Sequence, residues 1–254
     1  MSRALGVVPA RMGSSRFPGK PLALLAGLPM IQHVFERTAG CRLLDEVVIA
    51  TCDDEIARAA VGFGARAVMT AADHERATDR VAEVSARDGA DIIVMVQGDE
   101  PMVRPEMVEA VVRALRGDPS LSCVNLAAPI QDEDELRDPN TIKLVTDYRG
   151  RALYFSRSPI PHGWRQSFHE GTWLKQICVM AFTRDALRSF AALPQGPLEV
   201  AESVDMLRFL EHRLPVQVAM TAGGTHAVDT PEDLARVAAL MAAQQWPAQG
   251  ATGA

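Results

Sequence analysis

Short apolar stretches alternate with segments of helical periodicity through the first half of the chain, and this alternation limits the possible folds most strongly. Val, Ile and Leu runs of strand length are separated by stretches whose apolar residues recur every three or four positions. This order predicts an α/β fold, a Rossmann-like and mostly parallel sheet with helices on both faces. The expected strands span residues 5–8, 46–50, 66–69, 91–96 and 122–127, and the expected helices 31–39, 54–62, 78–87 and 105–115.

The second half of the sequence is less regular. Strand patterns at 142–146, 152–156 and 177–182 predict a smaller β-rich segment, inserted at about residues 140–190, for acceptor binding and dimerisation. An amphipathic pattern predicts one helix over 198–211, and Thr230 followed by Pro231 is typical of a helix start. We find no internal repeat or linker, so residues 1–246 are expected to form one nucleotidyltransferase domain and 247–254 a disordered tail.

The stretch from Val7 to Pro21 leads from the first strand into a loop that combines glycines with three cations. Glycine lets backbone N–H groups approach a ligand closely, and successive N–H groups in a turn form an anion-binding concavity. Arg11, Arg16 and Lys20 add charged donors suited to phosphate oxygens. These residues, with Gly13, Ser14 and Ser15, predict a triphosphate site, although the Walker pattern is absent.

Two acidic residues are candidates for a magnesium site. Asp99 follows the most apolar strand of the sequence, and its loop would lie at the same sheet edge as the loop after Val8. Mg²⁺ is usually held by one or two carboxylates together with phosphates and water. The segment around Asp229, taken alone, indicates only a capped helix.

Composition narrows the class of protein. The net charge of -6 argues against a general nucleic-acid binder, so any basic site must be local. The four cysteines are widely spaced and indicate free thiols in a reducing compartment. No signal peptide or membrane-spanning run is recognised, and we therefore expect a soluble cytoplasmic protein without a membrane partner.

The opening loop resembles that of cytidylyltransferases that activate acidic sugars, in particular the 3-deoxy-manno-octulosonate (Kdo) cytidylyltransferases. The resemblance rests on Ala10-Arg11, Arg16 and Pro18-Gly19-Lys20-Pro21, on Gln97-Gly98-Asp99-Glu100-Pro101, and on Val228-Asp229-Thr230-Pro231-Glu232-Asp233-Leu234. It extends to about Met241. It implies that Asp229 joins Asp99 at Mg²⁺, that cytosine is read near Pro9 and Ala10, and that the protein is a homodimer.

The reaction implied is attack of an acceptor oxygen on the α-phosphorus of CTP with release of pyrophosphate. Positioning and charge neutralisation dominate such transfers. Arg11, Arg16, Lys20 and Asp99 are the expected catalytic residues, and Gln97 is expected to touch the nucleotide and the acceptor. No histidine is assigned a role, because His33 lies in a helical stretch and His162 and His169 in the irregular one.

The acceptor side matches the family less well. Thr78-Asp79-Arg80 is retained, and the resemblance implies that Arg80 binds an acceptor carboxylate, but Arg76-Ala77 replaces the family's Ser-Gly. A family His and Tyr are replaced by Gln176 and Met180, and further on Asp205 and Met206 replace Glu and Gln. The expected acceptor-binding residues are Arg76, Thr78, Arg80, Gln97, Gln176, Glu199, Glu202 and Asp205.

These departures leave the acceptor open between Kdo, another acidic sugar and a small phosphonate such as phosphonoformate. A phosphonate suits the added cation and the lost hydroxyl partners. Other classes fit less well: a dehydrogenase lacks its Gly-x-Gly-x-x-Gly, and a metal-dependent glycosyltransferase lacks its Asp-x-Asp. A non-catalytic nucleotide-binding protein would not need both Asp99 and Asp229.

Overall fold

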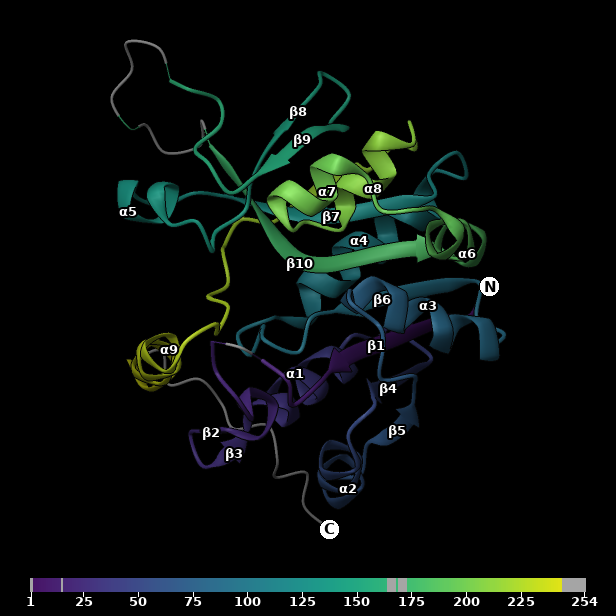
Figure 1. Ribbon diagram of the computed structural model, residues 1–254, viewed down its shortest axis with the longest axis vertical. Helices are drawn as coiled ribbons and strands as arrows, with labels where there is room; N and C mark the ends of the chain where they lie inside the picture. Colours follow the sequence, from purple (N-terminus) through teal and green to yellow (C-terminus); the bar gives the residue numbers. More distant parts are fainter. Residues whose placement is uncertain (1, 15, 164–167, 169–172, 244–254) are drawn as a thin grey trace.

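The computed structural model describes residues 2–14, 16–163, 168 and 173–243, and within them most strands join one sheet (Figure 1). Its strands follow the order β11-β7-β10-β6-β1-β4-β5, and β8 and β9 extend it beside β10. The strands are β1 (Ala4–Ala10), β4 (Glu46–Thr51), β5 (Arg66–Met69), β6 (Ile92–Val96), β7 (Cys123–Pro129), β8 (Lys143–Thr146), β9 (Ala152–Ser156), β10 (Leu174–Thr183) and β11 (Gln217–Met220); β2 (Leu24–Leu25) and β3 (Leu28–Pro29) pair separately.

Helices cover both faces of this sheet, as expected from the alternating sequence pattern. One face packs on α3 (Ala77–Arg87), α6 (Arg184–Ala192) and α8 (Met206–Glu211), and the other on α1 (Met30–Ala39), α2 (Asp54–Gly62) and α4 (Pro105–Gly117). Strand β1 serves both cores, because Leu5 and Val7 face the first set of helices while Ala4 and Val8 face the second. The remaining helices are α5 (Glu133–Arg137), α7 (Pro197–Glu202), α9 (Pro231–Ala243) and the short 3-10 turn η1 (Lys20–Leu22).

The sheet topology places two loops together. β1 runs parallel to β6, with Val7 opposite Met95, so both strands end at the same edge. Gly98, just after β6, lies against β1, because an added Cβ there would come within 2.8 Å of the Pro9 carbonyl oxygen. The loop after β1 and the loop that carries Asp99 therefore meet at this edge.

The segment at 140–190 is more closely joined to the main sheet than the sequence indicated. Its longest strand, β10, lies between β6 and β7 and is antiparallel to both, so it is a central strand. Only β8 and β9 project from the end of β10 as a hairpin (Figure 1). Strand β11 and helices α5 and α6 were not expected from the sequence.

The single helix expected over 198–211 is wrong. The chain forms α7 and α8 instead, separated at Ser203, whose φ of 52° is in the left-handed region. The break lets α8 turn back on α7, so that the Arg208 guanidinium pairs with the Glu199 carboxylate through two hydrogen bonds of 2.7 Å. The two buried charges thus neutralise each other. In one continuous helix, Glu199 and Arg208 would lie too far apart along the axis to pair.

All four cysteines are free, as their spacing predicted. No helix in the described part of the chain has the length and apolar character needed to cross a membrane. The tail expected at 247–254 lies outside the described residues.

Candidate active site

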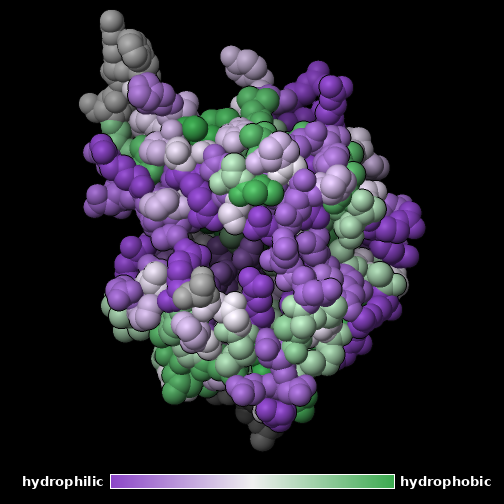
Figure 2. All heavy atoms as spheres, in the orientation of Figure 1, coloured by the Kyte–Doolittle hydropathy of each residue, from purple (hydrophilic) through white to green (hydrophobic). Residues whose placement is uncertain are grey.

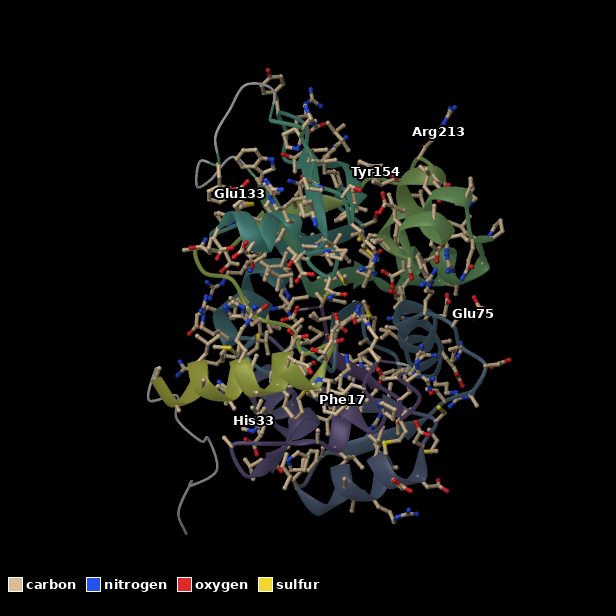
Figure 3. The ribbon with its side chains drawn as sticks, turned by 60° about the vertical axis from the view of Figure 1, so that its left-hand side comes forward. Phe17, His33, Glu75, Glu133, Tyr154 and Arg213 are labelled. Carbon is tan, nitrogen blue, oxygen red and sulfur yellow. The ribbon has the colours of Figure 1, made fainter. Side chains whose placement is uncertain are left out.

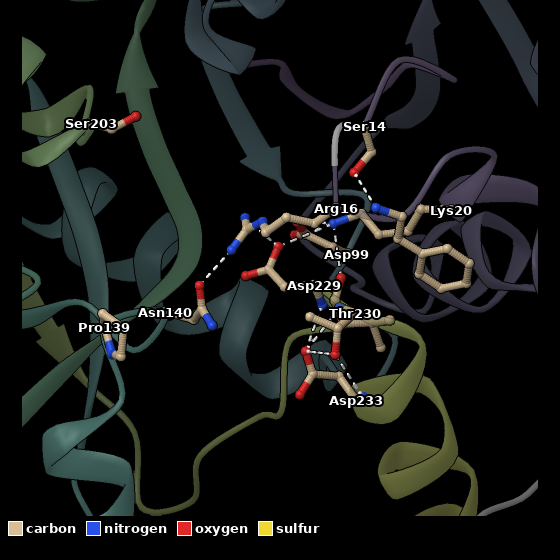
Figure 4. A network of polar contacts seen from close by, with 12 residues as sticks. Ser14, Arg16, Lys20, Asp99, Pro139, Asn140, Ser203, Asp229, Thr230 and Asp233 are labelled. Carbon is tan, nitrogen blue, oxygen red and sulfur yellow. Dashed lines mark hydrogen bonds and ion pairs between the residues drawn. The ribbon is translucent and has the colours of Figure 1, made fainter.

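Asp99 and Asp229, which are 130 positions apart in the sequence, meet at the side chain of Lys20 (Figure 4). The Lys20 ammonium lies 2.9 Å from an Asp99 oxygen and 3.4 Å from an Asp229 oxygen, and it also donates to the Val228 carbonyl at 2.8 Å. Burial disfavours the charged amine, but the two carboxylates outweigh this effect and raise the pKa of Lys20 above 10.5. The sequence-predicted carboxylate pair is thus brought together.

The packing of helix α9 positions Asp229, which lies just before the start of this helix. Its apolar residues Val237 and Met241 pack with Leu25 and Met30, and Phe17 of the cation-bearing loop joins the same cluster (Figure 3). The start of α9 is a reciprocal cap: the Asp233 backbone N–H donates to the Thr230 hydroxyl at 3.2 Å. The Asp233 carboxylate in turn accepts from the backbone N–H of Asp229 at 3.0 Å and of Thr230 at 2.9 Å.

Arg16 joins the same charge cluster from the exposed side of the loop. Its guanidinium donates to an Asp229 oxygen at 2.9 Å and to the side-chain oxygen of Asn140 (Figure 4). The loop turns back at Gly19, whose φ of 72° favours glycine, and the Gly19 N–H donates to the Met12 carbonyl at 3.2 Å. The result is a compact turn with Arg16 and Lys20 on one side. Ser15 lies outside the described residues.

These groups open into a cavity of about 480 Å³, and Figure 2 shows a recess surrounded mainly by hydrophilic residues on this side of the molecule. A cavity of this size suits a nucleotide with a small partner. Among the residues predicted from the sequence, its walls include Pro9, Ala10, Arg11, Gly13, Ser14, Arg16, Lys20, Arg76, Arg80, Gln97, Asp99, Gln176, Asp205 and Asp229.

The site combines several cations with two carboxylates. This combination suits a polyanion that binds together with a divalent cation. Within the described ranges no group of three or more His, Cys, Asp or Glu side chains is arranged to hold a metal ion. A divalent cation at Asp99 and Asp229 would therefore take its other ligands from phosphate and water, which is the usual habit of Mg²⁺. His74 also lines the cavity, but its Nε2 lies 2.5 Å from the Glu83 carboxylate.

Comparison with known proteins gives the family. The sequence pattern of the family described as "Cytidylyltransferase" matches residues 5–216. The chain is 47% identical over 240 residues to the 3-deoxy-manno-octulosonate cytidylyltransferase of Geobacter sulfurreducens, covering 91% of this chain and 96% of the relative. This chain belongs to the cytidylyltransferase family. It is accordingly a nucleotidyltransferase.

Two further comparisons indicate the same family. The 3-deoxy-manno-octulosonate cytidylyltransferase of Escherichia coli is 43% identical over 242 residues, which cover 95% of this chain and 97% of the relative. A solved structure of CMP:2-keto-3-deoxy-manno-octonic acid synthetase complexed with CTP superposes with a TM-score of 0.88 at 43% identity, covering 96% of this chain and 100% of that one. A Leptospira borgpetersenii cytidylyltransferase, 16% identical with a TM-score of 0.64, shares the fold.

In this cytidylyltransferase, Arg76 and Arg80 come from the start of α3 on the wall away from Asp229. The Arg80 guanidinium is buried and donates to the Thr70 hydroxyl and, at 3.2 Å, to the Ala71 carbonyl, and no carboxylate pairs with it within the described residues. Arg76 donates to the Ser203 hydroxyl at 2.8 Å and lies 3.3 Å from a Glu199 oxygen. Arg80 is therefore the better placed of the two to meet an acceptor carboxylate.

Three residues expected to bind the acceptor do not line the cavity. The Thr78 hydroxyl is fully buried and donates to the Asp205 carboxylate. Glu199 is fully buried in its pair with Arg208, and Glu202 accepts from the Ser156 hydroxyl at 2.8 Å and from the Arg157 N–H at 2.8 Å. These side chains use their polar atoms on the protein itself, so their placement supports a role in holding the wall.

The two methionines that replace family polar residues also lie elsewhere. Met180 and Met206 are 1% and 0% exposed, and both pack in the core on the side of α3, α6 and α8. Neither lines the cavity, so neither takes a hydroxyl partner away from an acceptor. Gln176 does line it, and its amide donates to the Asn125 side chain at 2.6 Å.

Asn140 and Arg157 line the cavity but were not predicted from the sequence. Asn140 precedes β8 and Arg157 follows β9, and both face the cavity because this hairpin projects beside β10. Their residue types carry no local signal of this placement. The expectation that the irregular segment supplies the acceptor side was the one sequence-based indication available.

Proposed function

We propose that the enzyme transfers CMP from CTP to Kdo and releases pyrophosphate. The observation that supports this most is the joining of the cation-bearing loop to Asp99 and Asp229 through Lys20, in a chain of the same family as the CTP-bound synthetase. The cavity beside this cluster is large enough for a nucleotide and carries arginines on its opposite wall.

We propose Mg²⁺ as the cofactor, with Asp99 and Asp229 as its protein ligands. The two carboxylates fit a cation, because they already share one positive group, the Lys20 ammonium. Bound Mg²⁺ would neutralise phosphate charge and orient the reacting oxygens.

The residues of the chain then have separate tasks. Arg11, Arg16 and Lys20 stabilise negative charge on the phosphates as pyrophosphate departs, and Pro9 and Ala10 lie at the wall where the base is read. Arg80 holds the acceptor carboxylate, and Gln97, which also lines the cavity, touches the nucleotide and the acceptor. This arrangement contributes chiefly by orientation, since the attacking hydroxyl must face the α-phosphorus.

A small phosphonate acceptor is not favoured. It rested on the added cation and on the loss of several hydroxyl partners, and two of the replacing residues, Met180 and Met206, face the protein core. The added cation, Arg76, is already engaged by Glu199 and Ser203. A non-catalytic nucleotide-binding role is not favoured either, because it would not need Asp99 and Asp229 to lie together beside Lys20.

We also propose a homodimer formed through the irregular middle segment. Tyr148 and Leu153 of the β8–β9 hairpin and Val200 of α7 are exposed apolar side chains that a partner chain would cover. The cytoplasm is the compartment that we propose, in keeping with four free thiols. Light scattering of the purified protein, compared with its Leu153→Asp variant, tests the dimer.

An acceptor panel tests the function. Purified enzyme with CTP and Mg²⁺ is offered Kdo, a nonulosonic acid and phosphonoformate, and pyrophosphate release is followed, with UTP replacing CTP in a parallel series. We expect saturable turnover with Kdo and CTP. The Asp99→Asn variant serves as the inactive control. Turnover of phosphonoformate without turnover of Kdo would contradict the proposal.

A further inference from the structure

Lys143 is a fully buried cation whose partners are three backbone carbonyl groups. It is 0% exposed, and its ammonium donates to the carbonyl oxygens of Asp138 at 2.8 Å, Thr141 at 2.7 Å and Arg157 at 2.6 Å. An ammonium has three N–H donors, and each has its own acceptor here. Such a group joins the loop before β8 to Arg157, just beyond the end of the β8–β9 ladder, where Lys143 pairs with Ser156.

The segments joined in this way carry the two cavity residues that the sequence did not predict. Asp138 and Thr141 flank Asn140, and Arg157 is the residue that follows β9. A second link runs the other way, since the Arg157 guanidinium donates to the Pro139 carbonyl at 2.8 Å. The Lys143 ammonium therefore closes a ring between the loop at 138–141 and Arg157.

The outer ends of this ring reach both parts of the reaction centre. Asn140 accepts from the Arg16 guanidinium, which also donates to Asp229. Arg157 is fixed through its backbone N–H by Glu202 and through its Nε by the Glu202 carbonyl at 2.7 Å. Arg157, held by these bonds to Glu202, also lines the cavity.

We propose that Lys143 is a positioning residue for the acceptor: its ammonium sets the places of Asn140 and Arg157 on the acceptor wall without touching either substrate. This proposal rests on the proposed transfer to an acidic sugar. Methionine at this position would have a similar length but no donor, and three buried carbonyl groups would lose their partner. The wall would then loosen, while the cluster of Lys20, Asp99 and Asp229 keeps its own contacts.

The test compares Lys143→Met with Leu144→Ala. Leu144 is the next residue of β8, is 1% exposed and packs in the core, so its truncation destabilises the same strand without touching the ring. Measurements below both melting temperatures give KM for Kdo and for CTP. We expect Lys143→Met to raise the KM for Kdo about tenfold, and that for CTP by a smaller factor, because Asn140 accepts from Arg16. Leu144→Ala should change neither by more than about twofold.

Hydrogen exchange provides a readout that needs no acceptor. Lys143→Met should speed amide exchange at 138–141 and 157–158 beyond the change in Leu144→Ala. If Lys143→Met is insoluble, Lys143→Gln keeps two donors and should show the same pattern at smaller amplitude. Equal exchange and equal KM values in the two variants would overturn the proposal. If the wild-type enzyme ignores Kdo, the proposed function fails, while exchange still decides whether Lys143 holds the wall.

Discussion

The Asp229→Asn substitution separates the proposed catalytic role of the carboxylate pair from its role in stability. Asn keeps the shape of the side chain and removes the charge that faces Arg16 and Lys20. The lost pairing costs little stability, because the Arg16 side chain is 48% exposed and solvent screens it. Lys20 keeps Asp99 at 2.9 Å and the Val228 carbonyl at 2.8 Å. We expect a loss of about 1 kcal/mol in the free energy of unfolding.

The catalytic effect of Asp229→Asn is expected to be much larger. One of the two proposed magnesium ligands would lose its charge. The Mg²⁺ that neutralises negative charge on the phosphates would then be held less well. Removal of a single group of this kind costs roughly 10²- to 10³-fold in kcat, or about 3–4 kcal/mol. The assay is pyrophosphate release with CTP and Kdo over a range of Mg²⁺ concentrations. Urea denaturation gives the stability of each variant.

Asp233→Asn is the matched control. It removes the same charge four positions away, and Asp233 caps α9 by accepting from the backbone N–H of Asp229 and Thr230. Asn keeps a side-chain oxygen that can accept these bonds, so the loss of stability should be less than about 1 kcal/mol. Its activity should stay within about tenfold of wild type, since the Asp229 carboxylate remains. If Asp229→Asn kept more than about a tenth of wild-type kcat with unchanged Mg²⁺ dependence, the reasoning would be refuted.

Three further predictions concern charged side chains in and behind the cavity. Lys20→Met leaves Asp99 and Asp229 without their shared cation, so Mg²⁺ should raise its melting temperature more than that of wild type; equal shifts would count against a common site. Glu199→Gln breaks a fully buried pair with Arg208 and should cost about 3–5 kcal/mol in urea denaturation, while CTP binding by calorimetry stays unchanged. Burial, joined by the Glu199 charge, raises the pKa of Asp205, so the folded state holds that proton more tightly than the unfolded chain. The wild-type free energy of unfolding should therefore fall relative to Asp205→Asn as pH rises above the ordinary value of 3.8, and a constant difference would contradict this.

Local sequence patterns were enough for the elements that depend on nearby residues. The apolar run that became β6 was predictable because a strand buried on both faces needs apolar residues throughout. Thr230 and Pro231 marked the start of α9, since capping depends on a few adjacent residues. The single helix expected over 198–211 failed because its break at Ser203 depends on a turn of the chain that brings Arg208 to Glu199.

The sequence by itself determined the α/β order of strands and helices and the presence of a cationic glycine loop, because both are written in short-range periodicity and residue type. Only the tertiary structure decided that α9 packs beside Phe17 and brings Asp229 to Lys20. It likewise decided that Met180 and Met206 face the core and that Asn140 and Arg157 face the cavity. Such placements depend on contacts between residues far apart in the chain, which local periodicity does not record.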